Sequence, residues 1–211
     1  RLTWRGLDSF FFNSTKVALV FSRTESFHFS NRHETTKIDL PLLRTFIPMN
    51  TDAMEKTATW IQSKGLTIID QDFSRPWGGF LVIAEEDSQS FANHFFPGVE
   101  GIPINQGVRL SPKILMVNPG QRLSWQYHYR RREMWTVLVG PVAVATSPTD
   151  EELPAIEYHQ GDLITLQCGE RHRLIGKDSM GIVAEFWIHT DFNHLSDEDD
   201  IVRVQDDYAR K

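Results

Sequence analysis

The sequence predicts an all-β protein, either a sandwich or a small closed barrel, flanked by short helices. The second half of the chain consists of short apolar runs, and turn signals such as "NPG" (118–120), "GP" (140–141) and "GD" (161–162) divide them. Many short strands at close spacing are typical of sandwiches and barrels. The 211 residues are enough for one sizeable domain with its own core.

Residues 51–96 predict two short helices and two strands. Thr51 or Asp52 can cap a first helix, "TDAMEKTATWIQSKG", and Gly65 can end it. The expected elements that follow are a strand at 66–70, a turn "RPWGG" at 75–79, a strand at 80–86 and a helical turn at 88–96.

Strands dominate the rest of the prediction. They are expected at 112–120, 121–129, 133–141, 142–146, 162–169, 172–176 and 181–189. The last segment, "SDEDDIVRVQDDYARK", is charged, and we expect it to be helical after Ser196. Cys168 is expected to be a small buried turn residue.

The first 48 residues lack a sustained helical or strand period. Residues 1–48 are therefore left as an unassigned N-terminal arm, and residues 49–211 are expected to form the domain. We favour the hypothesis that 1–48 is a translated leader or follows from a misplaced start, with the working protein beginning near Met49 or Met54. A genuine arm is the alternative.

Charge and composition narrow the classes of partner. The net charge is 22 − 28 = −6, which argues against a general nucleic-acid binder. No apolar run approaches the roughly 18–20 residues that span a bilayer, and 10–21 lacks a signal cleavage site. The single cysteine, Cys168, excludes an intramolecular disulfide and fits a cytoplasmic protein. A small anionic ligand remains compatible, because local arginines can outweigh the global charge.

A candidate metal site lies in two separated segments. In a strand over 121–129, alternation places Gln126 and His128 on one face. Glu133 on the next strand can come opposite His128, and His172 follows a later strand. One amide oxygen, one carboxylate and two imidazoles suit a divalent metal such as Zn²⁺ and leave positions open for water or substrate.

The spacing of these residues resembles the two cupin motifs, with Gln126 where many cupins have a histidine. "LSWQYHYRRREMW", "RPWGG" and "EDDIVRVQDDYAR" resemble signatures of type II mannose-6-phosphate isomerases. The resemblance covers roughly residues 66–211. It implies a cupin-type jelly-roll barrel, a divalent metal with Zn²⁺ as the expected ion, and interconversion of mannose 6-phosphate and fructose 6-phosphate.

The same resemblance implies roles for further residues. Arg131 and Lys113 match family residues thought to act at the substrate, and we expect them to be catalytic. Arg173 and Arg203 are candidates for binding the phosphate. Larger relatives fuse this cupin to a guanylyltransferase domain of GDP-mannose biosynthesis, for which this chain has no room. The general base cannot be named from the sequence.

Several alternatives stay open. Met134 and Gln167 depart from the family pattern, so an isomerase or epimerase of another sugar phosphate is one alternative. A non-catalytic sugar-binding cupin and a metal-dependent oxygenase are two others, although an oxygenase usually has more histidine ligands. Glu185 either faces the cavity or pairs with a nearby arginine. A homodimer is also compatible with the sequence.

Overall fold

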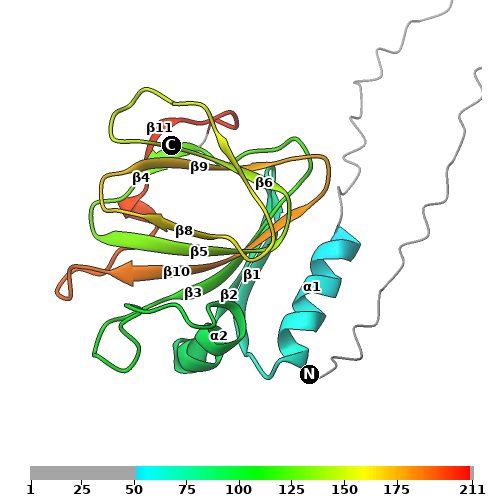
Figure 1. Cartoon of the computed structure of the whole chain (residues 1–211), viewed down its shortest axis with the longest axis vertical. Coiled ribbons are helices and arrows are strands. Elements are labelled where there is room, and N and C mark those ends of the chain that lie inside the picture. The colour runs from blue at the N-terminus through cyan, green and yellow to red at the C-terminus, as the bar shows by residue number, and fades with distance from the viewer. Residues whose placement is uncertain (1–50, 210–211) are drawn as a thin grey trace, which may run out of the picture. The chain divides into compact units, whose positions relative to one another are not determined.

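The computed structural model describes residues 51–209, and the predicted arm at 1–48 lies outside the described residues. Two antiparallel sheets face each other and form the barrel shown in Figure 1, which confirms the all-β jelly-roll prediction. Two short helices accompany them, α1 (Thr51–Ser63) and α2 (Ser88–Phe95), as the sequence predicts. Within 51–209, no helix has the length and apolar character needed to cross a membrane.

The larger sheet has the strand order β1-β2-β3-β10-β5-β8. Its strands are β1 (Ile68–Arg75), β2 (Gly78–Ile83), β3 (Pro112–Val117), β10 (Gly181–His189), β5 (Arg131–Val139) and β8 (Leu163–Leu166). The smaller sheet has the order β11-β4-β9-β6-β7. Its strands are β11 (Val202–Gln205), β4 (Trp125–Tyr127), β9 (Arg171–Gly176), β6 (Val142–Ser147) and β7 (Ile156–Tyr158).

Apolar side chains form two separate cores. One core joins the helices to the larger sheet through buried residues such as Met54, Ile61, Phe91 and Phe186. Met54 and Ile61 lie seven residues apart, which places them on one face of α1. The helices therefore cover the outer face of the larger sheet.

The second core lies between the two sheets. It includes Leu115, Val137, Val144 and Leu174, from strands of both sheets. Leu115 and Val137 lie farther along β3 and β5 than Lys113 and Arg131 do. The apolar residues fill one end of the barrel, so the opposite end is left for polar groups.

The structure corrects the predicted C-terminal helix. Residues 198–200 form a short 3₁₀ turn, η2 (Glu198–Asp200), and Val202–Gln205 form β11 beside β4 (Figure 1). The charge pattern favoured a helix, but unsatisfied backbone groups at the edge of β4 pair with this segment as a strand. The sequence also missed β7. Cys168 is exposed rather than buried, because it lies in the turn that follows β8.

Candidate metal centre and active site

The inner face of the larger sheet becomes polar at one end of the barrel. Alternation along β5 points Arg131, Glu133 and Trp135 to one face, and all three are buried. The antiparallel register sets Trp187 of β10 opposite Glu133 and Glu185 opposite Trp135. Strand geometry alone therefore gathers two carboxylates, two indoles and a guanidinium in one place.

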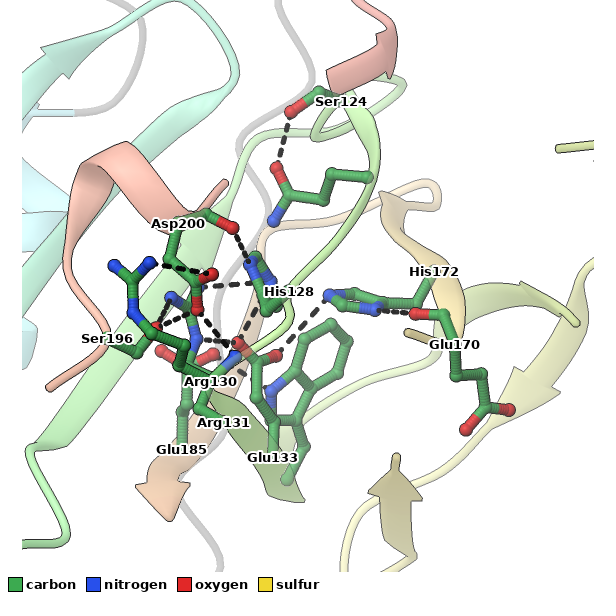
Figure 2. A network of polar contacts seen from close by, with 12 residues as sticks. Ser124, His128, Arg130, Arg131, Glu133, Glu170, His172, Glu185, Ser196 and Asp200 are labelled. Atoms are coloured by element: carbon green, nitrogen blue, oxygen red, sulfur yellow. Dashed lines mark hydrogen bonds and ion pairs between the residues drawn. The ribbon is translucent and has the colours of Figure 1, made fainter. Parts of the chain in front are cut away.

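Three candidate metal ligands converge beside this face (Figure 2). His128 follows β4, Glu133 lies in β5, and His172 lies in β9. His128 Nε2 is 3.2 Å from one carboxylate oxygen of Glu133, and His172 Nε2 is 3.4 Å from the other. The three donor atoms all lie within 4.8 Å of one another. Segments far apart in the sequence thus meet as the spacing predicted.

Both histidines are oriented by backbone carbonyls. Nδ1 of His172 lies 2.9 Å from the carbonyl oxygen of Glu170, and Nδ1 of His128 lies 3.4 Å from that of Asp200. A proton on Nδ1 that is donated to the carbonyl leaves the lone pair on Nε2, as in metal-binding histidines. Burial lowers the pKa of His128 well below its usual value, which keeps that ring in the neutral form that a metal requires.

Two buried atoms of this group have no hydrogen-bond partner among the described residues. They are Glu133 Oε2 and His172 Nε2. Buried polar atoms are normally paired, so a facing pair without partners indicates a place for a cation. Two imidazole nitrogens and a carboxylate suit Zn²⁺ or a similar divalent ion. The residues therefore fit the expected metal, while ligation and the identity of the ion stay predictions.

Gln126, the fourth predicted ligand, lies directly opposite His172 in the pairing of β4 with β9. Its Oε1 accepts a hydrogen bond from Ser124 Oγ at 2.6 Å. A carbonyl oxygen has two lone pairs, so this hydrogen bond leaves one for a cation. The structure brings Gln126 beside the other three residues, and its coordination of a metal stays a prediction.

Arg131 joins the candidate ligands to the C-terminal segment. Its Nε donates to Glu133 Oε1 at 2.8 Å, and Nη2 donates to His128 Nε2 at 3.0 Å. Its guanidinium carbon also lies 3.5 Å from the centroid of Trp187. Burial opposes ionisation of Glu133, but the surrounding imidazoles and Arg131 outweigh it and lower the pKa of Glu133 to about 2. Glu133 is therefore a charged carboxylate at neutral pH.

Asp200 and Ser196 hold the turn that carries His128, and sequence reasoning identified neither. The carboxylate of Asp200 accepts hydrogen bonds from the backbone N–H groups of Tyr129 at 3.1 Å and Arg130 at 3.0 Å. The hydroxyl of Ser196 donates to the same carboxylate (Figure 2). The available signal was the C-terminal signature "EDDIVRVQDDYAR", which contains Asp200.

A cavity opens beside the candidate ligands. Its polar wall includes Lys113, Gln126, Arg131, Glu133, Glu185, Glu198 and Arg203, and the two candidate histidines are not among its lining residues. Lys113 Nζ lies 3.0 Å from the ring centroid of Trp187, and burial lowers the pKa of Lys113 to about 8. Both residues predicted to be catalytic and one of the two predicted substrate-binding arginines therefore share one cavity.

Arg173 lies elsewhere. It follows His172 in β9, so alternation turns it to the opposite face of the strand. Its Nη1 pairs with Glu152 at 2.7 Å, and its Nη2 donates to the backbone oxygen of Gln205 at 3.3 Å. Arg173 is not on the cavity wall. The geometry thus corrects its expected place: it supports the C-terminal strand instead of facing the cavity.

A barrel of two antiparallel sheets with a His-Glu-His group at one end defines a cupin with a candidate metal centre. The chain belongs to the family described as "Mannose-6-phosphate isomerase C-terminal", and the match covers residues 84–206. That range contains the four predicted metal ligands as well as Lys113 and Arg131.

The chain is also similar to parts of larger proteins. The xanthan biosynthesis protein XanB of Xanthomonas campestris pv. campestris is 34% identical over 107 residues, which are 51% of this chain and 21% of that protein. Mannose-1-phosphate guanylyltransferase 2 of Escherichia coli O157:H7 is 28% identical over 151 residues, 72% of this chain and 25% of that protein. The alginate biosynthesis protein AlgA of Pseudomonas putida is 32% identical over 107 residues, 51% of this chain and 20% of that protein.

In these matches the chain spans a quarter or less of each relative's length. Among solved structures, hazelnut (Corylus avellana) vicilin superimposes with a TM-score of 0.45 at 14% identity, covering 63% of this chain and 36% of that one. That likeness is too distant to indicate a function.

Proposed function

We propose that this chain is a metal-dependent isomerase that interconverts mannose 6-phosphate and fructose 6-phosphate. One observation carries the proposal: the buried group of His128, Glu133 and His172 adjoins a cavity whose wall holds Lys113 and Arg131. A cation site beside fixed cationic side chains suits a substrate that has adjacent carbonyl and hydroxyl oxygens and a phosphate.

The description of the family and the name of one relative favour mannose 6-phosphate among the hexose phosphates. The family is described as the C-terminal part of mannose-6-phosphate isomerase, and one relative is named for its action on mannose 1-phosphate. Arg203 is the candidate for binding the phosphate, because its guanidinium lies on the cavity wall and can form forked hydrogen bonds. A cytoplasmic location and a homodimer stay predictions from the sequence.

The reaction moves a proton between C2 and C1 of the open-chain sugar through an enediol. A divalent metal held by His128, Glu133 and His172, with Gln126 beside them, would polarise the carbonyl. Arginine has five N–H donors, and Arg131 uses donors for Glu133 and Ser196. A metal on His128 Nε2 would take the lone pair that accepts from Arg131 Nη2, which leaves that donor for a substrate oxygen. Arg131 would therefore stabilise negative charge that develops on that oxygen.

The test is a coupled assay for fructose 6-phosphate, with the full chain, mannose 6-phosphate and Zn²⁺, Co²⁺ or Mn²⁺. We expect turnover that falls at least about 100-fold in His172→Ala, because a catalytic metal supplies several kcal/mol. Glu157→Gln is the control, since Glu157 is exposed on β7 and does not line the cavity.

The alternatives predict different results. Turnover of another hexose phosphate would keep the isomerase class and change the substrate. Tight sugar-phosphate binding without any turnover would indicate a binding protein instead. Bound iron together with oxygen uptake would indicate an oxygenase, and either of the last two results would contradict the proposal.

A further inference from the structure

Glu185 is a buried carboxyl group on the wall of the same cavity, and it is not part of the candidate metal centre. It lies in β10 and is 3% exposed. The register of the larger sheet sets it between Trp135 of β5 and Lys113 of β3. Figure 2 shows it beneath Arg131, near Glu133.

The orientation of this carboxyl group is fixed. Trp135 Nε1 donates to Glu185 Oε1 at 2.9 Å. On the neighbouring strand, Lys113 Nζ packs over Trp187, the residue two positions after Glu185. An acidic and a basic side chain thus face the cavity from adjacent strands, with indole rings beside both.

The three carboxylates on the cavity wall differ in how free they are to exchange protons. Glu133 is a candidate metal ligand and accepts a hydrogen bond from Arg131 at 2.8 Å, and both contacts require the ionised carboxylate. Glu198 is largely exposed and lies 3.9 Å from Arg203 at the rim. Among the described residues that line the cavity, Glu185 is therefore the carboxyl group suited to accept and return a proton.

Its proton affinity agrees with that assignment. The pKa of Glu185 is raised to about 8, mainly by burial and then by the charge of Glu133, while Lys113 and Arg131 oppose the rise. Burial lowers the pKa of Lys113 to about 8, although Glu185, Glu198 and Glu133 oppose that shift. Groups with pKa values near the working pH are effective in proton transfer in both directions.

We propose that Glu185 is the acid–base residue of this site and that Lys113 is its partner; this rests on the isomerase function proposed above. The ionised Glu185 takes the proton from C2 of the open-chain aldose, and the C2–H electron pair forms the C1–C2 double bond of an enediolate. Lys113 donates a hydrogen bond to an oxygen of that enediolate. The carbonyl pair released at C1 rests on O1, and the hydroxyl proton of O2 moves to O1. As the C2 carbonyl forms, the C1–C2 double-bond pair takes the proton from Glu185 at C1, which yields the ketose and regenerates the carboxylate with no net oxidation.

The test is Glu185→Gln, which keeps an oxygen for Trp135 Nε1 and removes the exchangeable acid. We expect kcat to fall at least about 100-fold, as for loss of a general acid–base group. Metal content, melting temperature and the Kd for mannose 6-phosphate from calorimetry should stay at wild-type values. Glu157→Gln, the same chemical change at an exposed position on β7, is the control for kcat.

A second measurement separates proton transfer from positioning. Wild-type protein in D₂O should incorporate deuterium at C2 of recovered mannose 6-phosphate, and Glu185→Gln should lose this exchange while still binding the sugar phosphate. Exchange or turnover within threefold of wild type in Glu185→Gln would refute the role of Glu185 and leave the isomerase proposal intact. A wild-type protein without turnover of any hexose phosphate would refute both.

Discussion

Arg131 and Ser196 lie 65 residues apart in sequence and are joined by a buried hydrogen bond of 2.7 Å from Nη1 to Oγ. The same hydroxyl donates to Asp200, whose carboxylate holds the backbone of Tyr129 and Arg130. The C-terminal segment therefore fixes both ends of the turn between His128 and Arg131. This link explains how a segment outside the larger sheet can control the geometry of the candidate site.

Ser196→Ala should weaken that link. The substitution removes one donor to Asp200 and one acceptor for Arg131, so we expect the free energy of unfolding to fall by about 1–3 kcal/mol. Urea unfolding measures it. Ser63→Ala removes an exposed hydroxyl at the end of α1 and should change the free energy by less than about 0.5 kcal/mol. Equal effects of the two substitutions would show that the link does not stabilise the fold.

The ligand assignment predicts metal contents. His128→Ala and Glu133→Ala should each lose bound metal after dialysis, because each removes a donor from the candidate centre. Arg131→Ala should retain metal, since its guanidinium cannot coordinate a cation. Elemental analysis of the purified variants gives the stoichiometry. Stoichiometric metal in both His128→Ala and Glu133→Ala would place the ion elsewhere.

Stability should decrease on mild acidification because of His189. Its Nδ1 accepts from the backbone N–H of Ser196 at 3.0 Å, and burial, with nearby Arg109, lowers its pKa from 6.5 to about 4. Above pH 6.5 the ring is neutral in both states. Between pH 6.5 and 4 only the unfolded state gains the proton, so up to about 3 kcal/mol is lost and the loss levels off below pH 4.

Urea unfolding between pH 7.5 and 4.5 tests the role of His189. His189→Asn keeps an acceptor for Ser196 but does not titrate, so its stability should vary less with pH over this range. His159→Asn alters an exposed histidine and should follow the wild-type curve. A wild-type slope in His189→Asn would show that other groups cause the acid sensitivity.

The two arginines predicted to bind phosphate should behave differently. Arg203 lies on the cavity wall, so Arg203→Met should raise KM for a sugar phosphate about 10-fold or more. Arg173→Met should leave KM within about twofold and lower the melting temperature, because it leaves Glu152 without its buried partner. Steady-state kinetics and thermal unfolding separate the effects. A large rise in KM for Arg173→Met would restore its assignment to substrate.

The sequence by itself determined the fold class and most of the strands. Alternating and continuous apolar runs with Gly and Pro turn signals specify strands locally, and the spacing of Gln126, His128, Glu133 and His172 indicated which residues would meet. These features depend on periodicity, which can be read from a single segment.

Only the tertiary structure decided what surrounds those residues. The segment after Ser196 forms β11 because the edge of β4 pairs with it, and no local signal reports that partner. Contacts between segments that are distant in sequence determine the roles of Asp200, Ser196 and Glu185. Arg173 does not line the cavity, although the sequence suggested a substrate-binding role. The register of β9, and not the charge of Arg173, sets the direction of its side chain.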